Sequence, residues 1–139
     1  MGLLTETLNA FKGMVQDFFA FKPPDLSIPK EYEMTPIERK MYFALKRAGY
    51  DPYPQYSVCG YRLDFAVFEN GIKLDIECDG KEYHSEPWQK AHDRKRTRIL
   101  NRNGWKVIRF TGSQIYSDVN KCVTRVDKKL RDSKSWFLH

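Results

Sequence analysis

The sequence predicts an α/β domain with elements in the order αβββαβ, plus one additional helix before this core and another after it. Three observations support this class. Apolar residues recur at helical spacing near both ends of the chain, two alternating segments flank an Asn70–Gly71 turn, and an apolar segment follows Gly104. The chain has 139 residues, of which 41% are hydrophobic, so it can bury the core of one domain.

Residues 3–20 are predicted to form an amphipathic helix, because apolar residues from Leu4 to Phe18 recur at helical spacing. Pro23 and Pro24 end this pattern. Residues 1–34 are therefore expected to be a helical arm with a linker, and residues 35–139 the domain proper. An apolar helical face outside the domain is also compatible with a homo-oligomer.

The core is predicted to begin with a helix that runs to about Ala48 and ends at Gly49. Thr35 stands at the N-cap position and Pro36 at the first helical position, and Glu38 completes a capping box. A capping box explains Glu38 as a local stabiliser of the helix without any functional role.

Three strands are expected next, over residues 53–59, 61–68 and 72–78. The last two alternate apolar and polar residues around Asn70–Gly71, a strong signal for a two-residue hairpin turn.

The remaining elements are a helix over 87–102, a strand over 105–110 and a final helix capped by Ser113. The final helix should face the core with a stripe of apolar residues from Ile115 to Leu130.

A two-residue loop fixes the pairing of the hairpin, because residue 69 then faces residue 72 and each step outward moves one residue along both strands. Asp64 is therefore expected opposite Glu77, and Arg62 opposite Asp79, with Cβ atoms about 4.5–5.5 Å apart. Asp75 belongs to the same face. The other face should be apolar and comprise Leu63, Phe65, Val67, Ile72, Leu74, Ile76 and Cys78.

Like charges placed opposite one another destabilise a sheet unless a cation neutralises them. Carboxylate oxygens are the ligands that Mg²⁺ or Mn²⁺ prefers, and such an ion can orient water and stabilise charge on a scissile phosphate. The alternative is a solvated polar face on which Arg62 and Lys73 pair with the acids.

His84 follows this segment, and a neutral imidazole there could take a proton from an attacking water, with Asp93 holding the ring. A surface loop histidine is an equally good interpretation of His84 from spacing alone. His92 is predicted to be a surface residue. Trp105 is expected in the core.

The chain has a formal net charge of +6, and basic residues crowd the helix over 87–102. This arrangement favours contact with a phosphate backbone, although a solvated helix face gives the same pattern. The candidate DNA contacts are Arg62, Lys81, Lys90, Arg94, Lys95 and Arg98.

Three cysteines without a CxxC pair indicate a reducing cytoplasm rather than a disulfide framework. No apolar run approaches the roughly 18 residues that would span a bilayer, so no membrane partner is expected.

Glu38, Asp64 within RLDF, the segment IECDG, His84 and the segment DRKRTRILNRNGWKVIRF together resemble the PD-(D/E)XK nuclease superfamily over about residues 35–110. The likeness is greatest to the very-short-patch-repair branch, which includes the EDxHD homing endonucleases of phages. It implies a restriction-endonuclease-like core with a mixed central sheet flanked by helices.

The resemblance also implies roles for single residues. Asp64 would be the central metal-binding aspartate, and Glu77 to Asp79 would add metal contacts, including the backbone carbonyl of Cys78. His84 would be the general base or a phosphate contact, oriented by Asp93, and Glu38 would face the site from its helix. The superfamily pattern has Lys where this chain has Asp79, so the lysine role falls to His84 or Lys81.

The sequence thus predicts a Mg²⁺- or Mn²⁺-dependent endonuclease acting on double-stranded DNA, the catalytic domain of a homing endonuclease. A mismatch-repair nickase and a restriction component remain open as biological roles. The sequence has no obvious helix-turn-helix or zinc finger, so a separate DNA-recognition domain is expected as an alternative partner to a second copy of the chain. A DNA-binding module with a degenerate nuclease core is the alternative from a different class.

Overall fold

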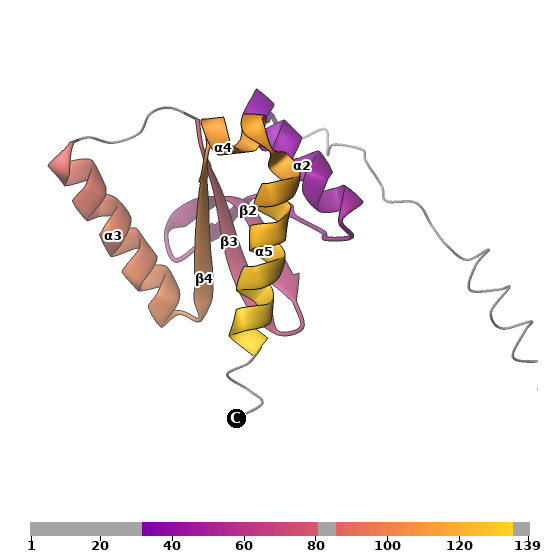
Figure 1. The fold of residues 1–139 in the computed structure, drawn as a ribbon. Helices are drawn as coiled ribbons and strands as arrows, with labels where there is room; N and C mark the ends of the chain where they lie inside the picture. Colours follow the sequence, from indigo (N-terminus) through magenta and orange to yellow (C-terminus); the bar gives the residue numbers. More distant parts are fainter. Residues whose placement is uncertain (1–31, 81–85, 135–139) are drawn as a thin grey trace, which may run out of the picture.

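The computed structural model describes residues 32–80 and 86–134. The predicted helix over 3–20, Lys81 and His84 lie outside these ranges. The described elements, shown in Figure 1, are α2 (Pro36–Arg47), β1 (Tyr53–Val58), β2 (Tyr61–Glu69), β3 (Ile72–Asp79), α3 (Pro87–Arg102), β4 (Trp105–Thr111), α4 (Gly112–Ser117) and α5 (Val119–Lys134).

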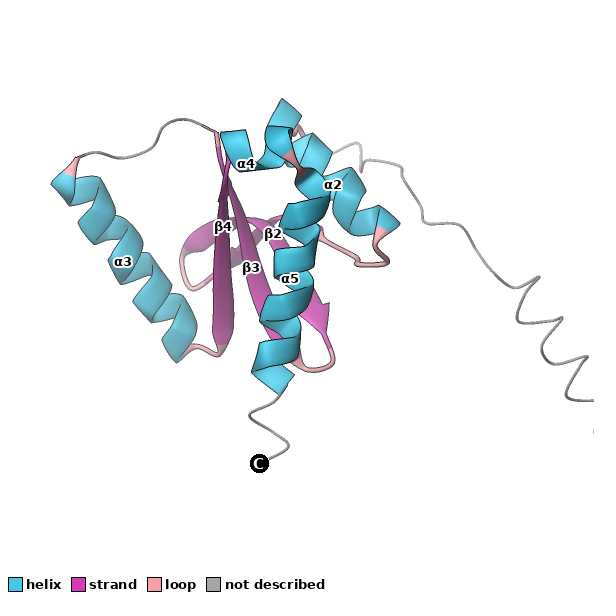
Figure 2. Ribbon diagram, in the orientation of Figure 1, coloured by secondary structure: helices cyan, strands magenta, loops and turns pink. Residues whose placement is uncertain are grey.

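The four strands form one sheet in the order β1-β2-β3-β4. The β1–β2 and β2–β3 pairs are antiparallel, and β3–β4 is parallel, so the sheet is mixed. Helices α2, α4 and α5 lie on one side of the sheet, and α3, which connects the parallel pair, lies on the other (Figure 2). The predicted fold class is confirmed, because α3 forms the crossover that a parallel strand pair requires.

Both faces of the sheet are buried. The larger cluster joins Met41 and Leu45 of α2 and Val126 of α5 to β3 residues such as Ile76. Each such side chain contributes about 1.5–3 kcal/mol when it leaves water. The smaller cluster, beneath α3, comprises Leu63, Ala66, Leu100 and Trp105.

The hairpin has the predicted turn and register. Asn70 and Gly71 both have positive φ, 49° and 80°, as a two-residue hairpin turn requires. Pairing runs from Glu69–Ile72 back to Phe65–Ile76.

Beyond Phe65 the structure departs from the prediction. The regular β2–β3 pairing ends there, so neither Asp64–Glu77 nor Arg62–Asp79 forms a ladder pair. The side chains of Asp64 and Glu77 nevertheless interact, as their predicted position on one face requires. The Asp64 carboxylate accepts the Cys78 N–H at 2.8 Å, where a backbone carbonyl would serve in a regular ladder. Leu63 consequently packs with Leu100 in the smaller cluster rather than with Phe65.

The final helix is also divided, contrary to the prediction. Thr111, not Ser113, begins it, because Thr111 and Gln114 form a capping box. The chain then turns at Asp118, whose carboxylate accepts the Lys121 N–H at 3.0 Å, and α5 follows. At the first helix, the predicted capping box of Thr35 and Glu38 is confirmed.

Candidate functional site

The acidic residues predicted on one face of the hairpin form a buried cluster rather than a solvated face. Asp75 is 0% exposed and Glu77 is 5% exposed, both on β3, and Asp64 of β2 is partly buried beside them. Asp79 ends β3 and is also partly buried. We call Asp64, Asp75 and Glu77 the carboxylate cluster.

Asp64 is held against β3 by the Cys78 N–H. Burial, reinforced by the charge of Glu77, raises the pKa of Asp64 to about 7, against the opposing effect of that hydrogen bond. The carboxylate therefore takes up a proton readily unless a positive charge lies near it.

The pKa values of Asp75 and Glu77 are raised as well. Burial raises the pKa of Asp75 to about 6, while a hydrogen bond with Glu77 and the charges of Arg96 and Arg109 oppose the shift. Burial and the charge of Asp75 raise the pKa of Glu77 to about 8. Among the described residues, no donor reaches the carboxylate oxygens of Asp75 when Glu77 is ionised, and only protonation lets the Glu77 carboxyl donate to Asp75. Such a group is costly in a protein interior and marks a place where a ligand could be gained.

Two arginines that the sequence did not single out offset part of the negative charge of the cluster and of the neighbouring Asp79. Arg96 of α3 forms an ion pair with Glu77 and lies 3.9 Å from Asp75, and Arg109 of β4 lies 3.8 Å from Asp79. A helical spacing of four residues puts Arg96 on the same stripe as the buried Leu100. That spacing could have identified Arg96 as a residue facing the sheet.

The chemistry of the cluster suits a divalent metal ion, because hard carboxylate oxygens gather there and those of Asp75 receive no hydrogen bond while Glu77 is ionised. As the side chains stand, however, no three of the described His, Cys, Asp and Glu residues are grouped to hold an ion. The guanidinium of Arg96 lies among the carboxylates instead.

The Cys78 thiol is not suited to bind a metal ion, because only the deprotonated thiolate is a metal ligand. Burial first, and then the surrounding carboxylates, raise its pKa well above the usual range, so the thiol keeps its proton. Its backbone carbonyl is the remaining predicted contact. Cys59, Cys78 and Cys122 are all free, in agreement with the prediction of no disulfide framework.

The start of α2 lies close to the end of β3. A Cβ atom at Gly80 would lie 3.3 Å from Cδ1 of Ile37, and the charge of Glu38 contributes to the raised pKa of Cys78. Glu38 itself accepts the Thr35 N–H at 2.9 Å. The Glu38 carboxylate therefore caps α2 and at the same time lies near the end of β3.

The predicted DNA contacts on α3 are exposed: Lys90, Arg94, Lys95 and Arg98. Arg62 is exposed as well. His92 is on the surface and Trp105 is in the core, as predicted, with Lys73 over its ring. Asp93 is partly buried, and its predicted partner His84 lies outside the described residues.

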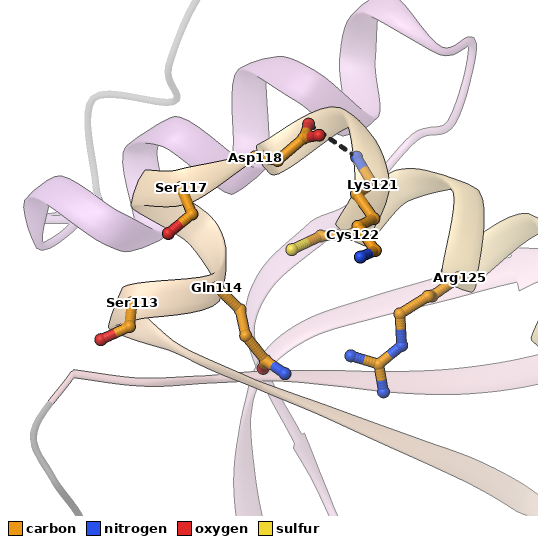
Figure 3. Close-up of a pocket in the computed structure, with 7 residues that line it drawn as sticks. All are labelled: Ser113, Gln114, Ser117, Asp118, Lys121, Cys122 and Arg125. Carbon is orange, nitrogen blue, oxygen red and sulfur yellow. Dashed lines mark hydrogen bonds between the residues drawn. The ribbon is translucent and has the colours of Figure 1, made fainter.

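A hollow of about 360 Å³ lies between α4 and α5, apart from the carboxylate cluster (Figure 3). The capping contact between Asp118 and Lys121 occupies one side of it. Its polar groups include Gln114, which already serves the capping box of α4. Its lining residues are Ser113, Gln114, Ser117, Asp118, Lys121, Cys122 and Arg125.

The mixed sheet, the crossover through α3 and the acidic residues on β2 and β3 define a restriction-endonuclease-like fold. The chain belongs to the REase_MTES_1575 family, a restriction endonuclease-like family whose sequence pattern matches residues 37–130. This match supports a nuclease.

Among solved structures, the chain is similar to one described as the homing endonuclease I-Bth0305I catalytic domain. The identity is 20% and the TM-score 0.46, with 76% of this chain and 98% of that chain covered. A likeness at this level says nothing about activity. No curated protein matches the chain significantly. Across the described ranges, no helix has the length and apolar character needed to cross a membrane.

Proposed function

We propose that the chain is a divalent-cation-dependent endonuclease domain that hydrolyses phosphodiester bonds in double-stranded DNA. The observation that supports this most directly is the buried carboxylate cluster of Asp64, Asp75 and Glu77 in a chain of a restriction endonuclease-like family. A purely structural sheet gains nothing from burying three acids together, since burial disfavours their charged forms.

Mg²⁺ or Mn²⁺, when bound, would supply stabilisation of charge on the scissile phosphate and a more acidic water. The residues proposed to hold the ion are Asp64, Glu77, Asp79 and the carbonyl of Cys78. The Cys78 N–H fixes the Asp64 carboxylate beside β3, so this ligand needs little reorganisation. We also propose His84 as the base that takes the proton from water, oriented by Asp93, with Lys81 as the alternative base.

The exposed basic residues of α3 are proposed to hold the DNA backbone. Lys90, Arg94 and Arg98 follow one another at intervals of one helical turn and are all exposed. A row of cations at this spacing can neutralise phosphates and raise affinity in a salt-dependent manner.

The test is nicking and linearisation of supercoiled plasmid with Mg²⁺, with Mn²⁺ and with EDTA. Wild type should cut only with a metal ion, and Asp64→Asn and Glu77→Gln should not cut. Asp51→Asn is the matched control, because Asp51 is an exposed acid away from the cluster. Equal cutting by wild type and Asp64→Asn, or cutting in EDTA, would refute the proposal.

A DNA-binding module without catalysis is the second candidate. It is favoured by Asp79 at the position where the superfamily pattern has Lys, and by the neutralisation of the cluster by Arg96. This candidate predicts salt-dependent DNA binding, no cleavage and no calorimetric signal with Mn²⁺.

We infer a homing role, rather than mismatch repair or restriction, from the sequence resemblance to the EDxHD enzymes alone. A cleavage-site survey on a DNA library separates these roles. One long target predicts homing, and cuts at mismatches predict repair.

A further inference from the structure

Arg96 differs from every other basic residue of α3, because its side chain faces the sheet and is only 17% exposed. It forms an ion pair with Glu77, lies 3.9 Å from Asp75, and donates to the Arg62 carbonyl at 3.3 Å. Its guanidinium also lies over the ring of Tyr61, 5.4 Å from the centroid. The contacts of Arg96 therefore join α3 to two strands, β2 and β3.

The pairing between Arg96 and the cluster is incomplete. Arginine holds a carboxylate most strongly through two parallel hydrogen bonds. Here the Nε atom of Arg96 has no hydrogen-bond partner among the described residues, and no arginine N–H donates to Asp75, whose hydrogen bond comes from Glu77 when that acid is protonated. Arg96 thus acts on Asp75 as a nearby positive charge rather than through two parallel hydrogen bonds.

The charges do not balance either. Arg96 contacts the buried acids Asp75 and Glu77, with Asp64 beside them, and Arg109 acts on Asp75 by its charge. When all three acids are ionised, their negative charge exceeds the positive charge of the two guanidinium groups. A buried ion pair that leaves acceptors unsatisfied recovers little of its desolvation cost. A cation with more positive charge and more coordination positions would satisfy this cluster better.

We propose that Arg96 is a resident counterion of the carboxylate cluster, which a divalent cation displaces when it binds. The proposal rests on the metal-dependent function proposed above. It makes the guanidinium and the metal ion competitors for Glu77, the carboxylate that Arg96 and the proposed ion would share. It also accounts for a cluster that has the oxygen donors for an ion and yet is not grouped around one.

The first test is calorimetric titration of the full chain with Mn²⁺. Arg96→Met removes the charge and keeps the length of the side chain, so Mn²⁺ should bind at least about tenfold more tightly than to wild type. Arg94→Met is the matched control, because Arg94 is exposed on the same helix and should leave the affinity nearly unchanged.

The second test observes Arg96 directly. The arginine Nε–H resonance of Arg96 is assigned by its absence in Arg96→Lys, and Mg²⁺ is then titrated into the wild-type protein. Displacement predicts a large shift of this resonance, and faster exchange with water, at the Mg²⁺ concentrations that saturate the site. This measurement needs no folded Arg96→Met protein.

Arg96→Met leaves buried acids without a counterion and could fail to fold. The double variant Arg96→Met with Asp75→Asn removes one charge of each sign and restores the balance. It should fold, and it should bind Mn²⁺ more tightly than Asp75→Asn alone.

The outcomes separate this proposal from the proposed function. If wild type binds Mn²⁺ and cuts DNA, but Arg96 removal does not tighten binding or the Nε–H resonance does not respond to bound Mg²⁺, Arg96 is a fixed structural residue and the displacement proposal is wrong. If neither wild type nor the Arg96 variants bind Mn²⁺, the metal-dependent function and the displacement proposal both fail.

Discussion

The Oδ2 atom of Asp64 accepts the backbone N–H of Cys78 at 2.8 Å, which joins a side chain of β2 to the main chain of β3 where their regular pairing has ended. A single carboxylate therefore does two things. It satisfies a buried backbone donor, and it places a negative charge beside Glu77, whose own charge raises the pKa of Asp64. Substitutions at Asp64 can separate these two contributions.

Asp64→Asn keeps an oxygen acceptor for the Cys78 N–H, whereas Asp64→Ala leaves that donor unpaired. We expect Asp64→Ala to lose about 1–3 kcal/mol of unfolding free energy. Asp64→Asn should match or exceed the stability of wild type near neutral pH without metal, because repulsion from Glu77 is gone. Both should lose cleavage by at least ~10²-fold, a scale typical of losing one essential group.

Urea unfolding in EDTA and plasmid cleavage measure the two effects separately. Equal destabilisation by the two Asp64 substitutions would show that the charge, not the hydrogen bond to Cys78, is what the fold requires.

The carboxylate cluster should make the metal-free protein less stable as pH rises. Asp64, Asp75 and Glu77 have folded-state pKa values of about 7, 6 and 8, above the ordinary values near 4. The folded state therefore binds more protons than the unfolded state between about pH 4 and pH 8. Unfolding free energy should fall through this window, by about 1.4 kcal/mol per pH unit for each excess proton.

Thermal unfolding in EDTA at about pH 5, 6.5 and 8 checks this window. The midpoint should fall as pH rises, and Mg²⁺ or Mn²⁺ should restore it most at the highest pH, where the acids are ionised. Asp75→Asn with Glu77→Gln is the control, and its midpoint should depend much less on pH. A wild-type midpoint that stays level or rises over this range would contradict the raised pKa values of the three acids in the folded protein.

Much of the fold could be predicted because local signals agreed with one another. Asn70–Gly71 fixed the β2–β3 register, and the Thr35–Glu38 box fixed the start of α2. The end of the pairing at Phe65 could not be predicted from alternation, since it depends on a side chain replacing a backbone acceptor. The division between α4 and α5 did have a signal, the Thr111–Gln114 spacing, which the more obvious Ser113 concealed.

The acidic residues of the candidate site could be predicted from the sequence, but the arginine that pairs with them could not. Alternation along the hairpin placed Asp75 and Glu77 on one face. Their burial required knowing that α3 covers this face, which is a tertiary contact. For the same reason the sequence does not distinguish Arg96 from the other basic residues of its helix, although Arg96 faces the sheet.

The exposed row on α3 should control the salt dependence of DNA binding. Lys90, Arg94 and Arg98 are exposed, and each one that contacts a phosphate contributes about 0.9 to the slope of log affinity against log salt. Replacing each by Ala should lower the slope by about this amount and weaken binding similarly for all DNA sequences.

Fluorescence anisotropy of a labelled duplex over a range of salt concentrations measures the slope. Lys128→Ala on α5 is the control, because Lys128 is equally exposed but lies on the opposite side of the sheet. An equal change in slope for Lys128 and Arg94 would indicate diffuse attraction rather than an interface on α3.

Substitutions at Glu38 and at its capping partner Thr35 can separate helix capping from catalysis. Its carboxylate accepts the Thr35 N–H at 2.9 Å, and its own N–H donates to the Thr35 hydroxyl at 3.4 Å. Glu38→Gln keeps the capping box, since Gln serves at this position, but removes the charge. Thr35→Ala keeps the charge and weakens the cap, at a cost of about 0.5–2 kcal/mol.

If Glu38 acts in the site, Glu38→Gln should leave the unfolding free energy nearly unchanged and reduce metal-dependent cleavage. Thr35→Ala should do the opposite, with lower stability and normal cleavage well below its unfolding temperature. Unfolding by urea and plasmid cleavage, measured on both variants, give the comparison. Full activity of Glu38→Gln would make Glu38 a helix cap whose position near the end of β3 has no part in the reaction, because a charge that is dispensable cannot be assisting a metal ion or its water.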